Sequence, residues 1–268
     1  MTRPALVLLL AGLRALRRTT VWWLIAIALL VGATVGFWPA FKGASGISQA
    51  IDNLPGAVID AFGLRDFGTP AGFLRGNLYE LFLPLLFSIA GVAFINGQTA
   101  ADEAAGRLEL FLSQPIRRRS LFATRAVGCL IVLAVIVVAT IAVQLAADGA
   151  VGLVIDGGFV AATAVLCGLL AAVHASLAYL VACLRPQPSM VLGIGVGVTI
   201  AGYVVAALFP ISSVLKPWRS ISPWDWALGG NPLESTSDPW RFAALAGASV
   251  ALLILGTLVV TRRDVASA

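Results

Sequence analysis

The sequence predicts an all-α polytopic membrane protein, with six helices that cross the bilayer and an N-terminal helix that lies in the membrane interface. Three observations lead to this class: a high hydrophobic content, a low content of charge, and six long apolar runs. Of the 268 residues, 59% are hydrophobic and 12% are charged, whereas about 25% are charged in an average soluble domain. So few charges exclude a water-soluble globule, and so much hydrophobicity excludes a disordered chain.

The N-terminal segment contains an apolar run, Ala5–Leu13, that is too short to span a bilayer. Arg14, Arg17 and Arg18 follow it at helical spacing. A signal peptide would end in small residues at a cleavage site, which this segment does not. We expect an amphipathic helix in the inner interface; the alternative is a cytoplasmic extension of the first span.

Six further stretches reach the ~20 apolar residues that a spanning helix needs. They are Val21–Phe41, Asn77–Gly97, Thr124–Ala146, Phe159–Cys183, Met190–Phe209 and Phe242–Thr261. None alternates with a period of two, as a membrane β-strand would. Because backbone groups in lipid have to be paired internally, we expect residues 1–268 to form one six-helix transmembrane domain.

Lys and Arg are divided unevenly between the two sides that these spans define. One side carries 12 of the 18 basic residues and 4 of the 13 acidic residues, and the other side carries the remaining 6 and 9. Because cytoplasmic loops carry the excess of Lys and Arg, we expect the first side, with both termini, to be cytoplasmic. The net charge of +5 therefore reflects topology, and binding of nucleic acid is not expected.

The sequence contains no pattern that predicts a catalytic, phosphate-binding or metal-binding site. Neither lysine, Lys42 or Lys216, follows a glycine, so no G-K-[ST] phosphate loop exists. Three cysteines in apolar stretches and one histidine give no metal-ligand spacing. We expect no catalytic, cofactor-binding or metal-binding residue on this chain. His174, inside the fourth span, is a candidate pathway residue; an interhelical hydrogen bond is the alternative.

Two G-x-x-x-G pairs lie within the spans, Gly32 with Gly36 in the first and Gly193 with Gly197 in the fifth. Such pairs let helices approach closely in lipid. The sequence leaves open whether these faces pack within the chain or between subunits. A further feature is the last outer loop, from Pro210 to Trp240, whose prolines and four tryptophans suggest a segment that dips back as a gate.

The loop of residues 98–123 is the most informative stretch. It begins with acidic residues, continues as an amphipathic helix, stops at a proline and then carries three arginines. Acid at the start of a helix and base after its end both complement the helix dipole. Such a short, rigid helix is suited to transmit force between two spans, and the arginines are also expected to bind phospholipid headgroups. The residues concerned are Asp102, Glu103, Leu108, Phe111, Leu112, Pro115 and Arg117 to Arg119.

This loop resembles the E-x-x-G-T-L-E-x-L-L-x-x-P-[VI]-x-R pattern of ABC-2 type transporter permeases. The matching residues are Glu103, Gly106, Leu108, Glu109, Leu110, Leu112, Pro115, Ile116 and Arg117. The closing TRRDVASA and the Ser222-Pro223 pair are also similar to that family. Two positions depart from the pattern: Arg107 stands where threonine is usual, and Arg125 where lysine is common.

The resemblance implies a function for the loop. In that family this loop is a coupling helix that seats in a separate ATPase subunit, which binds ATP and Mg²⁺ in place of this chain. The contact would be made by Glu103, Gly106, Leu108, Glu109 and Leu112, with Pro115 and Arg117 fixing its end. Two permease subunits, identical or paired, would form one pathway, with the first and fifth spans at their interface.

A non-catalytic permease subunit of the plasma membrane is thus expected, which exports a small hydrophobic drug, antibiotic or lipid by alternating access. One alternative is a secondary transporter or channel, for which inverted repeats and ionisable residues at the midplane would be expected. Another is a membrane-embedded lipid-modifying enzyme, which needs paired carboxylates or a His/Ser constellation at one depth. The sequence shows none of these features.

Overall fold

The structure is a computed structural model, and it describes residues 3–42, 53–56, 66, 68–107 and 117–261. Within these ranges it contains helices and no strands. Six helical stretches are long and apolar enough to cross a membrane, which confirms the predicted class. Their main helices are α1 (Arg3–Gly36), α6 (Phe82–Gln98), α9 (Arg118–Val151), α10 (Gly157–Leu184), α11 (Pro188–Leu208) and α13 (Pro239–Val260).

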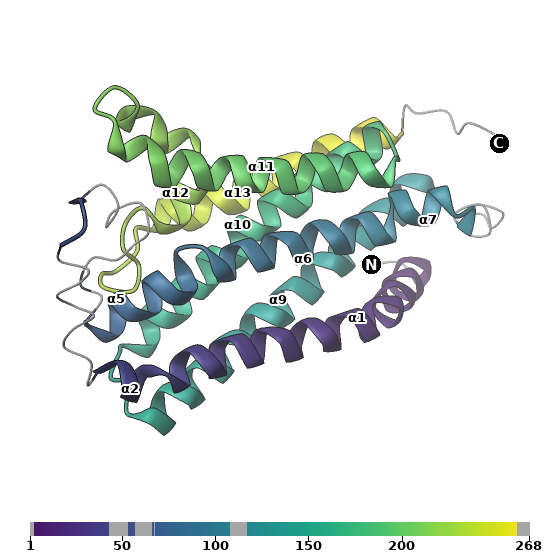
Figure 1. The fold of residues 1–268 in the computed structure, drawn as a ribbon. Coiled ribbons are helices and arrows are strands. Elements are labelled where there is room, and N and C mark those ends of the chain that lie inside the picture. Colours follow the sequence, from purple (N-terminus) through teal and green to yellow (C-terminus); the bar gives the residue numbers. More distant parts are fainter. Residues whose placement is uncertain (1–2, 43–52, 57–65, 67, 108–116, 262–268) are drawn as a thin grey trace.

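Shorter helices extend or connect these six. At one end of the bundle are α2 (Trp38–Lys42), α5 (Pro70–Leu74), the π-helix η1 (Arg75–Tyr79), the 3₁₀ turns η2 (Phe209–Ile211) and η3 (Lys216–Ile221), and α12 (Pro223–Leu228). At the other end is α7 (Ala100–Ala104) together with the start of α1 and the end of α13 (Figure 1). We call the end with α7 the inner end and the opposite end the outer end.

The centre of the bundle is α10, which packs against α6, α9, α11 and α13. In its membrane-spanning window 72% of the residues are buried, against 22% in α1, α11 and α13. Because α1 packs mainly on α9, it covers one side of the bundle and leaves much of its own surface open. The large outward-facing apolar surfaces of α1, α11 and α13 are suited to contact lipid or another subunit.

Local sequence signals explain where several helices begin. Proline occupies the first position of α11, α12 and α13, where its missing N–H costs nothing and its fixed φ favours the helix. The carboxylate of Asp156 accepts hydrogen bonds from the backbone N–H groups of Gly158 and Phe159 and so caps α10. Gly152, with φ +67°, ends α9 in the left-handed conformation that glycine favours.

At the N-terminus the structure shows the alternative to a separate interfacial helix, an extension of the first span. Ala5–Leu13 is not a separate helix, because it forms the first turns of the continuous helix α1. No proline lies between Pro4 and Gly36, and the alanine, leucine and arginine residues there are good helix formers. At 34 residues and ~1.5 Å per residue, α1 exceeds the ~30 Å hydrocarbon core. Its first turns therefore extend beyond that core and bend away from the main axis (Figure 1).

The second span also begins earlier than expected, at Pro70 and not at Asn77. Thr69 caps α5 through its hydroxyl group, which accepts a hydrogen bond from the Gly72 N–H. The chain then passes through the π-helix η1 before α6 begins. The polar residues Arg75 and Asn77 end the apolar run in the sequence, whereas the backbone stays helical across them.

Candidate functional site

At the inner end, the helix α6 stops at Gln98 and a short second helix, α7, begins after one irregular residue. Thr99 has φ −125° and ψ −88°, outside the helical region, and its hydroxyl group donates to the Ile95 carbonyl over 2.5 Å. Asp102 lies in the first turn of α7. Beyond α7 the chain turns at Gly106, whose φ of +69° is left-handed and suits glycine.

The carboxylate of Asp102 is bound by two arginines from opposite directions. Arg125, in the second turn of α9, is buried, and its Nη1 lies 2.8 Å from Asp102 Oδ2 and 2.5 Å from the Gln98 carbonyl oxygen. Arg107 places Nε at 2.8 Å and Nη2 at 2.6 Å from Asp102 Oδ1. We call Gln98, Asp102, Arg107 and Arg125 the inner clamp. It ties the end of α6, the helix α7 and the start of α9 into one unit.

Both residues that depart from the resembled pattern belong to the inner clamp. The charge at Arg107 is compensated inside the chain by Asp102, and Arg125 joins α6 to α7 from the far side of the loop. Sequence reasoning singled out neither Asp102 as a binding carboxylate nor Arg125 as its partner. The only available signal was that opposite charges flank the loop.

The structure places three of the expected coupling residues. Glu103 lies half-buried in α7, Gly106 is exposed at the turn after it, and Arg117 is exposed immediately before α9. The other four, Leu108, Glu109, Leu112 and Pro115, lie outside the described residues. Both flanks of the expected coupling segment are therefore attached to the inner ends of spanning helices.

At the outer end, the short helix α12 folds back onto the bundle, as the prolines and tryptophans of this loop suggested. Ser222 caps it: the hydroxyl group accepts from the Trp224 N–H over 3.2 Å and donates to the Gly202 carbonyl of α11 over 2.7 Å. The Trp224 ring is buried, and its Nε1 donates to the Glu80 carbonyl over 3.3 Å. Trp224 thus joins α12 to Glu80, the C-cap of η1, two residues before α6.

The Trp224 ring also contacts aromatic side chains from two other spans. Its centroid lies 5.4 Å from that of Tyr203 in α11 and 6.3 Å from that of His174 in α10. His174 is buried, and its Nδ1 lies 3.0 Å from the Ser88 hydroxyl of α6. Of the two alternatives for His174, the interhelical hydrogen bond is present, and the imidazole is tilted by 45° to the Trp224 ring.

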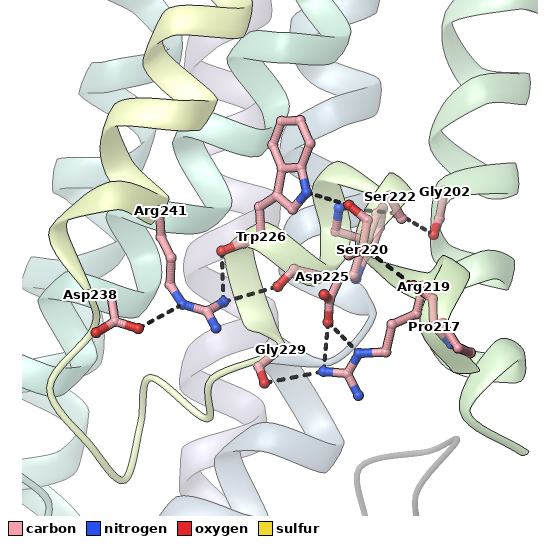
Figure 2. Close-up of polar contacts among 11 residues, drawn as sticks. Gly202, Pro217, Arg219, Ser220, Ser222, Asp225, Trp226, Gly229, Asp238 and Arg241 are labelled. Atoms are coloured by element: carbon pink, nitrogen blue, oxygen red, sulfur yellow. Dashed lines mark hydrogen bonds and ion pairs between the residues drawn. The ribbon is translucent and has the colours of Figure 1, made fainter. Parts of the chain in front are cut away.

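Arginines hold the C-terminal half of α12 (Figure 2). Arg219 Nε lies 2.8 Å from Asp225 Oδ1, and its Nη2 donates to the Gly229 carbonyl over 3.3 Å. On the other side, Arg241 of α13 donates from Nη1 to the carbonyls of Asp225 and Trp226, both at 3.0 Å. The Asp225 carbonyl also accepts from the Gly229 N–H, and positive donors at the carbonyl end stabilise this short helix. We call Arg219, Asp225, Trp226, Gly229 and Arg241 the outer network.

The two G-x-x-x-G pairs make no close packing contact in the described part of the chain. A Cβ atom added at Gly32, Gly36, Gly193 or Gly197 would meet nothing within 4 Å. Other glycines fill that role: an added Cβ at Gly195 would lie 2.7 Å from Val92, and one at Gly168 would lie 2.6 Å from Val137. The two motifs therefore face outward, and packing within the chain does not explain them.

No group of three or more His, Cys, Asp and Glu residues that could hold a metal ion is present among the described residues. Instead, the geometry consists of six spanning helices, a short helix clamped across their inner ends and another folded between their outer ends. This arrangement defines a multi-pass helical membrane protein with a structured segment at each membrane face. A search of curated proteins finds no match.

Comparison with protein families identifies the kind of membrane protein. Residues 7–265 match the family described as ABC-2 family transporter protein. Because the match covers nearly the whole chain, the protein belongs to this family. It is accordingly a membrane permease of an ABC transporter.

Proposed function

We propose that this permease is driven by a separate ATPase subunit and exports a small hydrophobic compound, such as a drug, an antibiotic or a lipid, by alternating access. The observation that carries the proposal is the inner clamp. A force applied to the coupling segment reaches α6 and α9 together, because Asp102 is held through Arg125 to both.

The coupling contact is assigned to Glu103, Gly106, Leu108, Glu109 and Leu112, with Pro115 and Arg117 at its C-terminal end. A partner that binds this segment differently in its ATP-bound and nucleotide-free states would shift the balance between two arrangements of the bundle. ATP and Mg²⁺ belong to the partner, since this sequence contains no phosphate loop.

In this proposal, the outer end closes the pathway through α12. The Trp224 ring lies between α6, α10 and α11, so movement of α6 at its inner end changes the space that the ring occupies. Release of α12 would open the outer face, and His174 would then border the pathway.

The proposed transporter contains two permease subunits, either two copies of this chain or this chain with a paired permease. The outward-facing glycine pairs of α1 and α11 support this arrangement, because close helix approach in lipid uses such faces. Gly36→Leu and Gly193→Leu should each lower the fraction of dimer in crosslinking of detergent-solubilised protein. Gly247→Leu is the matched control, because Gly247 is equally unobstructed but lies in α13 outside any such pair.

The inner end is assigned to the cytoplasmic face of the plasma membrane, from the 12 basic residues on that side. A reporter that is active only in the cytoplasm, fused to the C-terminus, should be active. The same reporter inserted after Gly152, at the turn between α9 and α10, should be inactive.

The experiment that tests the function is co-expression with a candidate ATPase, followed by co-purification and transport into inverted vesicles. Glu103→Ala should weaken co-purification and lower ATP-dependent transport of a hydrophobic dye. Asp238→Ala removes an exposed carboxylate from the outer end and should change neither. The proposal fails if Glu103→Ala leaves both unchanged, or if the purified permease alone hydrolyses ATP.

A further inference from the structure

An open cavity of about 540 Å³ lies at the inner end between α9 and α13. It is lined by Arg117, Arg118, Arg119, Val260 and Thr261. The arginines occupy the N-cap and first turn of α9, and the other two residues are the last residue of α13 and its C-cap. Two segments that are far apart in the sequence therefore form one basic hollow.

The positive charge in this cavity lies at the N-terminus of α9, where the helix dipole disfavours positive charge. The sequence predicts these arginines after the end of the coupling helix, where base complements the dipole. The structure adds that Arg118 and Arg119 also begin α9, whose N-terminal N–H groups carry partial positive charge. The first turn of α9 contains no acidic residue, and the side chain of Arg117 does not cap it. An anion bound here would offset this concentration of positive charge.

No carboxylate of the described residues offsets the charge on Arg117 or Arg119. The ion pairs of the inner end use Arg107 and Arg125, both with Asp102. The side chains of Arg117 and Arg119 are exposed and are therefore available to a ligand from solution or from the membrane. A guanidinium group donates N–H groups in a fork that fits a phosphate.

The depth of the cavity in the membrane favours a lipid over a free anion. The helix α13 contains 22 residues and is ~33 Å long at ~1.5 Å per residue, close to the ~30 Å of the hydrocarbon core. Its last residue therefore lies at the level of the headgroups.

We propose that this cavity binds the phosphate of an anionic phospholipid in the leaflet at the inner end. The exposed side chains of Arg117 and Arg119 bind the phosphate at the level of the headgroups. This site goes beyond the proposed function, since it requires only that the chain spans a membrane and involves neither the ATPase nor the substrate.

The test uses the full-length permease purified without an ATPase, with retained lipid measured by native mass spectrometry. Phosphatidylglycerol should be retained in preference to phosphatidylcholine. Arg117→Gln combined with Arg119→Gln should lower that retention at least tenfold. The control is Arg14→Gln combined with Arg185→Gln, which removes the same charge from exposed positions at the same end and should leave it within twofold. Thermal melting of each variant verifies that the protein is folded.

A second pair of variants tests whether α13 contributes to the site. Thr261→Glu introduces a carboxylate into the cavity and should lower retention of phosphatidylglycerol about tenfold. Gln187→Glu adds the same charge at an exposed inner position outside the cavity and should have little effect. Three results would overturn the proposal: equal retention of the two lipids, equal losses in variants and controls, or displacement of the lipid by millimolar inorganic phosphate, which would indicate a site for free anions.

Discussion

At the inner end α7 is held through one half-buried carboxylate and a buried arginine, whereas at the outer end α12 is held by an aromatic side chain and several partly exposed polar contacts. In the inner clamp both oxygens of Asp102 are used, and its partner Arg125 is almost completely buried. In the outer network Arg219 and Arg241 bind separate groups, and Trp224 packs independently of both. The inner end is thus built to move as one body, while the outer end is held by contacts that can be released one after another.

Loss of the buried charge in the inner clamp should have the largest effect. Arg125→Met leaves Asp102 with only the exposed Arg107 and removes the donor to the Gln98 carbonyl. Breaking a buried ion pair on one side typically costs about 3–5 kcal/mol, so we expect a loss of this size in the free energy of unfolding, measured by denaturation in detergent. Arg185→Gln, at an exposed position of the inner end, is the control. A change below 0.5 kcal/mol (about the ordinary surface effect) would show that the clamp does not hold the inner end.

At the outer end, the comparison predicts that one aromatic side chain matters more than any single ion pair. Trp224→Ala should cost about 3 kcal/mol, at the low end of the range for buried tryptophan, because a short helix such as α12 can relax into the space. Trp218→Ala removes a ring that is 58% exposed and should change stability little. Equal effects of the two substitutions in thermal denaturation would contradict the position assigned to Trp224.

A third pair of substitutions compares a packed glycine with an outward-facing one on the same helix. Gly195→Ala would place Cβ 2.7 Å from Val92 Cγ1, and such overpacking should destabilise the protein by about 1–3 kcal/mol. Gly197→Ala meets no atom within 4 Å, so the monomer should be unchanged or gain up to about 1 kcal/mol from the better helix propensity of alanine. Unfolding curves of monomeric protein in detergent distinguish these outcomes, and the reverse order would refute the assigned orientation of α11.

The smallest effect is expected at the exposed side of the inner clamp. The side chain of Arg107 is 57% exposed, and exposed ion pairs contribute about 0.2–1 kcal/mol. Arg107→Gln should therefore lower the free energy of unfolding by less than 1 kcal/mol, and the loss should shrink further at high salt. A loss as large as that of Arg125→Met would mean that both arginines hold Asp102 equally, and the account of a buried anchor would need revision.

The sequence predicted the six spans because length and hydropathy follow directly from the thickness of the bilayer. It left open whether the N-terminal segment is a separate interfacial helix or extends the first span, since the arginines after Leu13 interrupt the hydropathy but not the hydrogen bonding of the helix. The pairing of Asp102 with Arg125 also stayed hidden, because a contact across a loop depends on how α7 turns against α9. The sequence also did not indicate which of the four outer tryptophans is buried, because the burial of Trp224 depends on how α12 packs against the bundle.

Glycine spacing did not identify the glycines that pack inside the chain. The two G-x-x-x-G pairs stood out in the sequence, yet in the described structure close helix contacts are made at other glycines, among them Gly168, Gly195 and Gly256. A G-x-x-x-G motif indicates that one face of a helix has small side chains, but it does not indicate which other helix packs against that face. Only the positions of the neighbouring helices distinguish a glycine that packs inside the chain from one that is available to another subunit.

The claim that the inner clamp moves α7 and α9 as one body can be tested by pulsed electron paramagnetic resonance. Spin labels at Ala104 and Val127, both exposed, would report the distance between α7 and α9, and the three native cysteines are buried and should label poorly. In the proposed complex with an ATPase, this distance should be the same with and without ATP, while the spacing between the two proposed permease subunits changes. A change in the distance between α7 and α9 on addition of ATP would contradict the account.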